Sequence, residues 1–282
     1  MNAVEVADLR KSYGTVEALS GVTFEIRAGE VFSLLGPNGA GKTTTVEILE
    51  GYRRRDGGTA SVLGIDPEKA GREWRERIGV VLQQSELYGN LTVAEMLRMF
   101  AGYYTEPRDV DEVIQVVGLG EKRSARAKTL SGGQKRRLEL GLALVGDPEL
   151  LFLDEPTTGF DPQARRAAWE MIRSLRSLGK TILLTTHYLD EAQNLSDRVG
   201  VLVGGKIVTL GTPSELTETA RGAEIRYREN GELKVMHTDE PTRSLYELTR
   251  EAVEQGRELE QLEVRRATLE DVYLELVREN GE

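Results

Sequence analysis

Short apolar runs recur along the chain, and their pattern predicts a β-sheet. The segments 149–153 and 181–186 lack the polar alternation of a strand with one solvent-exposed face. Segments of this kind are typical of parallel strands whose two faces are both buried. The predicted strands are residues 4–6, 22–26, 30–35, 149–153 and 181–186, with a hairpin over 199–203 and 206–210 that turns at Gly204-Gly205.

Helix signals dominate the stretch between the first strands and the strand at 149–153. Thr92 and Glu95 have the spacing of a capping box and predict the start of one helix. Residues 109–117 predict a second helix, and Ser131 opens a third that runs to about residue 145. Residues 85–147 therefore predict a helical insertion in an α/β domain.

A domain boundary is predicted near Gly211-Thr212-Pro213. Beyond it, the turn Asn230-Gly231 joins two strand-like segments, and Thr268 caps a final helix. The expected order is strand 224–228, strand 232–236, helix 243–254, strand 259–264 and helix 269–278. We expect an α/β domain over residues 1–215 and a small α+β accessory domain over residues 216–282, which carries most of the acidic excess.

One loop carries the clearest chemical signal. It follows an apolar run, precedes a predicted helix and matches G-x-x-x-x-G-K-[ST], the phosphate-binding loop. Glycines let backbone N–H groups curl around phosphates, Lys42 can reach the β- and γ-phosphates, and the Thr43 hydroxyl can ligate Mg²⁺. The helix from Thr44 onward adds its positive end. The loop residues are Gly36, Pro37, Asn38, Gly39, Ala40, Gly41, Lys42 and Thr43. This loop predicts binding of a nucleoside triphosphate such as ATP.

Two carboxylates follow the predicted buried strand at 149–153. Asp154 at the strand tip can face the Mg²⁺ held by Thr43. Glu155 can polarise a water for in-line attack on the γ-phosphate. An apolar run that ends in Asp-Glu is weak evidence alone, but it becomes strong downstream of a phosphate loop.

A third motif places a second anion-binding element at a helix start. Leu130, Ser131, Gly132, Gly133 and Gln134 present a hydroxyl and bare N–H groups at a helix N-terminus. Here the chain resembles the nucleotide-binding subunits of ABC transporters, whose hallmark is the L-S-G-G-Q signature. The resemblance covers about residues 4–216 and implies a P-loop NTPase fold of the ABC type with a helical insertion.

The resemblance implies roles for four further residues. Tyr13 matches the aromatic residue that stacks on adenine, and Asp161 matches the loop aspartate after the carboxylate strand. Gln83 matches the loop glutamine that senses Mg²⁺ and the γ-phosphate. His187 matches the switch histidine that contacts the γ-phosphate. Together with Lys42 and Glu155, Gln83 and His187 form the expected catalytic set.

In this family a complete site needs two protomers arranged head to tail. The resemblance implies that each ATP lies between Lys42 of one copy and Ser131 of the other, so that ATP joins a homodimer. The helical insertion after Gln83 would relay closure to a separate integral-membrane subunit. The tail at 268–275 resembles that of ABC-2-type exporter ATPases, such as the daunorubicin-resistance group, and implies an ABC-2-type permease as partner.

Composition narrows the remaining choices. The chain has 282 residues, no cysteine, two histidines and a net charge of −10. Disulfides and thiolate metal sites are therefore excluded, and a phosphate-gripping nucleic-acid surface is not expected. No apolar run reaches the roughly 18 residues of a membrane span, and we expect neither a span nor a signal peptide. We expect a cytoplasmic protein held peripherally at the cytoplasmic face of the membrane by its partner.

Two other function classes stay open at this point. One is a soluble ABC-type ATPase that acts on ribosomes or nucleic acid, although the chain lacks the second domain, long coiled coil or basic stripe that such proteins carry. The other is a nucleotide-dependent regulator in which hydrolysis is incidental. Binding to RNA or DNA would distinguish the first, and tight ATP binding without turnover would distinguish the second. The accessory domain is expected to serve dimerisation or regulation.

Overall fold

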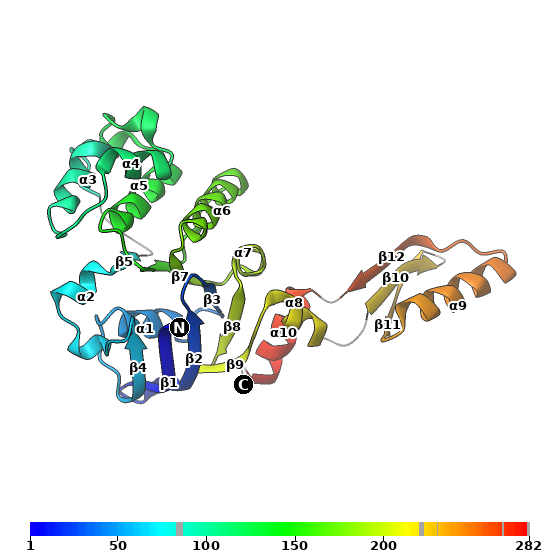
Figure 1. The fold of residues 1–282 in the computed structure, drawn as a ribbon. Helices are drawn as coiled ribbons and strands as arrows, with labels where there is room; N and C mark the ends of the chain where they lie inside the picture. The colour runs from blue at the N-terminus through cyan, green and yellow to red at the C-terminus, as the bar shows by residue number, and fades with distance from the viewer. Residues whose placement is uncertain (83–86, 220–222, 230, 267, 281–282) are drawn as a thin grey trace. The chain divides into compact units, whose positions relative to one another are not determined.

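The computed structural model describes residues 1–82, 87–219, 223–229, 231–266 and 268–280. The chain divides into two compact units, Met1–Leu210 and Gly211–Glu282. Within each unit the elements follow the order shown in Figure 1. Each unit has its own strands and helices, and each is described separately below.

A six-stranded sheet forms the centre of the first unit. Its strand order is β5-β6-β7-β3-β8-β9, and the pairs from β5 to β8 are parallel. Every residue of β3, β6 and β7 is buried, which confirms the prediction of strands covered on both faces. The strands are β3 Val31–Leu35, β5 Ile78–Val81, β6 Leu150–Asp154, β7 Thr181–Thr186, β8 Arg198–Val203 and β9 Lys206–Gly211.

An antiparallel sheet of order β2-β1-β4 packs against this centre. Phe24 of this sheet and Phe32 of β3 stack with ring centroids 5.2 Å apart. Helix α1 (Lys42–Leu49) contacts β2, β4 and β6 and fills the space between the sheets. The strands are β1 Asn2–Tyr13, β2 Val16–Arg27 and β4 Gly57–Val62. The predicted strands at 4–6 and 22–26 therefore form the start of β1 and the end of β2, which are both much longer.

The predicted helical insertion is present, and its helices begin at the predicted N-cap residues. Thr92 and Glu95 form a reciprocal capping box, and Asp109 accepts a hydrogen bond from the Glu112 amide. The three insertion helices share one buried apolar core with one face of the six-stranded sheet. The helices of the unit not yet named are α2 Arg72–Glu76, α3 Val93–Ala101, α4 Val110–Val116, α5 Gly132–Leu144, α6 Pro162–Ser177 and α7 Leu189–Leu195, with short 3₁₀ turns at Pro67–Lys69, Gly120–Lys122 and Ala127–Thr129.

The second unit has the predicted ββαβα order, preceded by one additional helix. Its sheet is antiparallel with the order β11-β10-β12, and α9 packs on β10. The elements are α8 Pro213–Thr219, β10 Ala223–Glu229, β11 Glu232–Thr238, α9 Pro241–Glu254, β12 Glu260–Arg266 and α10 Leu269–Asn280. In the part of the chain that the structure describes, no helix has the length and apolar character of a membrane span.

Candidate nucleotide-binding site

The phosphate loop connects β3 to α1, as the sequence predicts. Gly41 is the N-cap of α1 and has φ of +104°, a backbone conformation that only glycine adopts without strain. A Cβ at Gly41 would lie 2.6 Å from the Ala18 carbonyl oxygen, and a Cβ at Gly36 would lie 2.3 Å from that of Leu202. The loop is therefore pressed against its neighbours on one side, and glycine is required at both positions.

Lys42 is held within its own loop. Its side chain is almost fully buried, and its Nζ donates to the carbonyl oxygens of Gly36 at 2.8 Å and Pro37 at 3.1 Å. Burial lowers the pKa of the ammonium, while the nearby carboxylates of Glu155 and Asp154 act in the opposite direction. The Nζ lies 3.9 Å from Oε1 of Glu155. The structure thus brings the predicted phosphate-binding cation and the predicted general base together.

Asp154 ends β6 and is buried. Thr185 of the neighbouring strand β7 donates its hydroxyl to the Asp154 carboxylate. Burial raises the pKa of Asp154 and the Glu155 charge adds to this rise, whereas the Thr185 hydrogen bond and the Lys42 and Arg136 cations oppose it. A carboxylate in this setting gains from any cation that comes close to it.

Glu155 adopts a conformation that is rare for a residue with a side chain. Its φ is +45°, and its amide donates to the Thr185 carbonyl at 3.2 Å. Such a conformation costs on the order of 1–3 kcal/mol and persists where the surroundings fix it, which is common at active sites. The carboxylate of Glu155 faces the loop that contains Lys42, since its Oε1 lies 3.9 Å from the Lys42 Nζ.

His187 follows β7 and contacts the same carboxylate. Its Nδ1 lies 3.2 Å from Oε1 of Glu155, while Thr158 donates to Oε2 at 3.0 Å. The imidazole also packs on the Tyr188 ring at 4.1 Å between centroids. Lys42, Glu155 and His187, which are far apart in sequence, therefore form one cluster.

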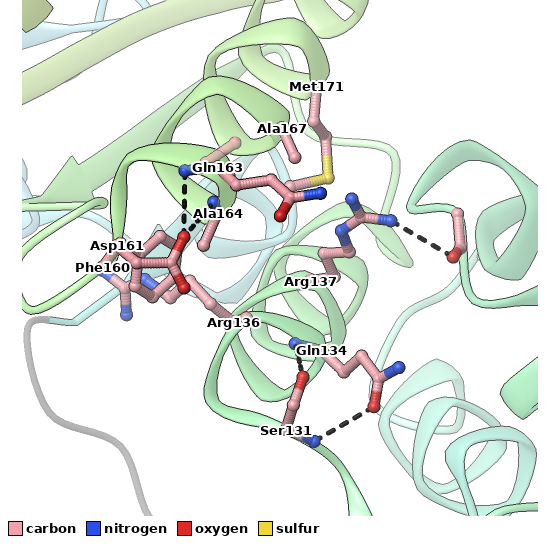
Figure 2. Close-up of a pocket in the computed structure, with 13 residues that line it drawn as sticks. Ser131, Gln134, Arg136, Arg137, Phe160, Asp161, Gln163, Ala164, Ala167 and Met171 are labelled. Atoms are coloured by element: carbon pink, nitrogen blue, oxygen red, sulfur yellow. Dashed lines mark hydrogen bonds between the residues drawn. The ribbon is translucent and has the colours of Figure 1, made fainter.

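The signature motif lies in a different pocket of the same unit. Ser131 is the N-cap of α5: its Oγ accepts from the Gln134 amide at 3.3 Å, and its amide donates to the Gln134 side chain at 3.0 Å. Asp161 caps α6 by accepting from the Gln163 and Ala164 amides. Figure 2 shows these two helix starts on the wall of one pocket of about 300 Å³. Gly133 also lines this pocket, but none of the phosphate loop does.

Three further predicted residues, Tyr13, Thr43 and Thr44, are described by the structure. Tyr13 ends β1 with its ring 41% exposed, and the Arg53 guanidinium lies 5.1 Å from the ring centroid. Thr43 is exposed and Thr44 is half-buried in the first turn of α1. Gln83 lies outside the described residues. Stacking of Tyr13 on adenine stays a prediction.

Two residues that organise the site were not singled out from the sequence. Thr185 is fully buried and bonds to Asp154 and to the Glu155 amide. Arg136 is 7% exposed and donates to three backbone carbonyls. A hydroxyl that follows the apolar residues Ile182–Leu184 in a buried strand is the sequence signal for Thr185, because a buried hydroxyl needs a hydrogen-bond partner. Arg136 precedes Leu140 by one helical turn, so its position on the apolar face of α5 is the corresponding signal.

A larger pocket of about 720 Å³ lies between β5, the end of α1 and the helical insertion. Its walls are mainly apolar, and acidic side chains line part of it. Burial raises the pKa of Glu50 to about 8, and the charges of Asp154 and Glu47 add to this rise. The apolar lining includes Ile78, Val81, Leu87, Met96 and Phe100, and the acidic lining is Glu47, Glu50 and Glu139.

The fold and the site together define a class. A glycine-rich loop leads from a buried parallel strand into a helix, and Asp154-Glu155 end a strand separated from it by one neighbour, in the order β6-β7-β3. This is the arrangement of a P-loop nucleoside triphosphatase.

Comparison with known proteins gives the family. A family model described as ABC transporter matches residues 19–158. The Nod factor export ATP-binding protein I of Rhizobium etli is 43% identical over 230 residues, which is 80% of this chain and 73% of that protein. The protein of the same name from Rhizobium meliloti (strain 1021) is 45% identical over 79% of this chain and 68% of that protein. The chain belongs to the ABC transporter family, as an ATP-binding subunit with ATPase activity.

Solved structures agree with this assignment. An ATP-binding subunit of an ABC transporter is 26% identical, has a TM-score of 0.71 and matches 98% of this chain and 99% of its own. CbiO1 from Clostridium perfringens, part of the ABC transporter complex cbiONQ, is 28% identical with a TM-score of 0.72 over 78% of this chain and 92% of its own. The ADP conformation of a further ATP-binding cassette is 26% identical with a TM-score of 0.68 over 76% of this chain and 92% of that chain. The predicted ABC-type fold is confirmed.

Proposed function

We propose that this chain is the ATP-hydrolysing subunit of an exporter, and that two copies close around two ATP molecules to drive a separate membrane permease. One observation carries the proposal: the two phosphate-binding elements of one chain line different places. Lys42, Glu155 and His187 cluster at the phosphate loop, whereas Ser131 and Gly133 line another pocket. A second copy, arranged head to tail, supplies the missing half of each site.

The cluster at the phosphate loop accounts for the chemistry of the chain's own half. Lys42 and the loop amides bind the β- and γ-phosphates. Glu155 accepts a proton from the attacking water. His187 orients Glu155 through its contact with Oε1, and it also contacts the γ-phosphate of the bound ATP. Positioned donors and a fixed base are the main protein contributions to phosphoryl transfer.

The donors around Asp154 fit a magnesium ion. The Thr43 hydroxyl and the Asp154 carboxylate are hard oxygen donors of the kind that Mg²⁺ prefers. Burial raises the pKa of Asp154, and a nearby cation would offset that effect. We assign Thr43, Asp154 and Gln83 to the metal, which supplies neutralisation of phosphate charge when bound.

The pocket beside β5 is the surface that we assign to the permease. It is large and mainly apolar, and it joins the end of α1 to the insertion helices, so a segment seated there touches both parts of the unit. Two relatives are named as export ATP-binding proteins, which supports an exporter. We further propose, from the resemblance of the tail at 268–275, that the permease is of the ABC-2 type and that the chain lies at the cytoplasmic face of the membrane.

The absence of cysteine from the chain makes the head-to-tail arrangement directly testable. We place Asn38→Cys in one preparation and Ser131→Cys in another, both in a Glu155→Gln background, and mix them with ATP and Mg²⁺. A disulfide-linked dimer on a non-reducing gel is expected only in the mixture and only with nucleotide. Equal cross-linking without ATP, or none with it, would contradict the proposal.

A further inference from the structure

Arg136 makes an unusual set of contacts for a residue one turn inside the signature helix. Its side chain is buried, and its guanidinium donates to the carbonyl oxygens of Asp154 at 3.1 Å, Pro156 at 3.2 Å and Leu82 at 2.6 Å. A fourth contact, at 2.8 Å, joins it to the Glu139 carboxylate, which balances its charge. The planar, multidentate donor geometry of arginine suits such a site, and lysine cannot reproduce it.

The three carbonyls belong to segments that matter for hydrolysis. Asp154 and Pro156 flank Glu155, so Arg136 holds the backbone on both sides of that residue. Glu155 has the strained φ of +45°, and a backbone in that state stays in place only when its neighbours fix it. Leu82 directly follows β5 and directly precedes Gln83 in the sequence. One buried cation therefore ties α5 to the carbonyls around the proposed base.

The next residue along the helix provides a contrast. Arg137 is half-buried and donates to the Gly118 carbonyl at 3.4 Å. Arg136 and Arg137 leave α5 in different directions, and Arg137 points across the pocket between α5 and α6 (Figure 2). Two adjacent arginines on the same helix thus differ in whether they touch the segment around Glu155.

We infer that Arg136 is a positioning residue that couples the two ATP sites of the closed dimer. The inference rests on the proposed function, in which Ser131 of one copy contacts the ATP bound by the other. Ser131 lies five residues from Arg136, which is about 7.5 Å along the helix axis. Engagement of α5 by the second copy's ATP is thereby transmitted through Arg136 to Glu155 in the chain's own site. ATP hydrolysis at the two sites is therefore cooperative, because the ATP in each site stabilises the same position of α5.

The test compares Arg136→Gln with Arg166→Gln in the full chain, because Arg166 is an exposed arginine of α6 that lines neither pocket. For Arg136→Gln we expect ATP affinity within about 3-fold of the wild type and a kcat lower by roughly 10- to 100-fold, the usual cost of a misplaced catalytic group. We also expect its Hill coefficient for ATP hydrolysis to fall toward 1, while Arg166→Gln retains both values. Thermal unfolding and circular dichroism measure the folded fraction by which kcat is normalised.

Arg136→Lys keeps the charge and the helix, and it serves if the glutamine variant does not fold. It is expected to lose the same cooperativity, because a point-like ammonium cannot span three carbonyls. An unchanged Hill coefficient and kcat per folded molecule in the variant that folds would overturn the inference. If the wild type itself neither hydrolyses ATP nor dimerises with it, the proposed function fails instead, so the two failures are distinct.

Discussion

Lys42 combines burial with a position beside the carboxylate of Glu155. Its ammonium is neutralised in part by Glu155 and is bonded to loop carbonyls, so it is fixed before any phosphate arrives. We expect Lys42→Ala to weaken ATP binding by at least about 10-fold, because a charge-assisted contact to phosphate is lost. Isothermal titration with ATP measures this. Lys180→Ala, which removes a surface pair with Asp147, is the control and should bind normally; an unchanged affinity in Lys42→Ala would count against the site.

Glu155 is proposed to remove a proton from water, which a neutral amide cannot do. Glu155→Gln should keep ATP binding and slow hydrolysis by roughly 10²- to 10⁴-fold. The variant should also accumulate as an ATP-bound dimer, visible by light scattering after size exclusion. Glu149→Gln, on the other end of the same strand region and paired with Arg77, should retain the wild-type rate. A monomer at all ATP concentrations would argue against the closed dimer.

Sequence reasoning singled out the residues to which we assign the chemistry, but not the residues that hold them in place. The loop around Lys42 and the pair Asp154-Glu155 follow from local patterns, since each depends on a few consecutive residues. A local pattern marks Thr185 and Arg136 as polar residues among apolar ones, but their contacts depend on which strand lies beside β6 and on how α5 packs, and the pattern does not show either. The left-handed backbone of Glu155 was equally hidden, because neighbours rather than residue type impose it.

At the scale of elements, the turn into α1 is tightly constrained by its neighbours. Gly39 and Gly41 both have positive φ, at +82° and +104°, but only a Cβ at Gly41 meets backbone. Both alanine variants should lose about 1 kcal/mol for the left-handed conformation. Gly41→Ala should lose clearly more because it also clashes with the Ala18 carbonyl. Urea unfolding of the two variants gives the comparison, and equal losses would show that the close approach is relieved without cost.

Glu50 at the end of α1 predicts a pH-dependent stability. Its pKa is about 8 in the folded chain and near 4.5 when unfolded, so the folded state retains a proton that the unfolded state has lost between these values. This group therefore lowers the free energy of unfolding as pH rises from about 4.5 to about 8. Glu50→Gln removes the effect and should be more stable than the wild type by on the order of 2 kcal/mol above pH 8, with little difference at pH 4.5. This is less than the full linkage value of about 1.4 kcal/mol per pKa unit, because solvent screens the half-buried carboxyl.

Urea unfolding at several pH values measures the Glu50 effect. The difference between variant and wild type should grow with pH and become constant above about 8. Glu73→Gln, at an exposed position of α2, is the control, because its charge is not among those that raise the pKa of Glu50. A difference that shrinks as pH rises would have the wrong sign and would refute the assignment.

Element prediction succeeded where a segment's own residues determine its state. The capped helices and the buried strands β6 and β7 were predicted correctly. Strands β4 and β5 were not predicted: β4 begins with two glycines, and β5 has only four residues after a short helix. Both exist because a neighbouring strand offers hydrogen bonds, and that partner is not visible in a local window.

At the scale of the whole molecule, the two compact units suggest separate tasks. The first unit contains both halves of the proposed site and its own cores, so residues 1–211 should fold and bind ATP within about 3-fold of the full chain. We propose that the second unit serves dimerisation or regulation. The truncated chain should then differ in ATP-driven dimerisation or in turnover, as measured by light scattering and phosphate release. Identical values for dimerisation, permease binding and turnover would refute that role.

The proposed division of the site between two surfaces of one chain has a consequence for how much ATP the cell hydrolyses. An isolated copy can hold nucleotide but has nothing to complete the reaction, so the rate per molecule should rise with the concentration of the protein itself. When a permease holds two copies side by side, dilution no longer matters, because their local concentration is set by the scaffold. ATP is then hydrolysed mainly by copies bound to a permease, and free copies hydrolyse little of it.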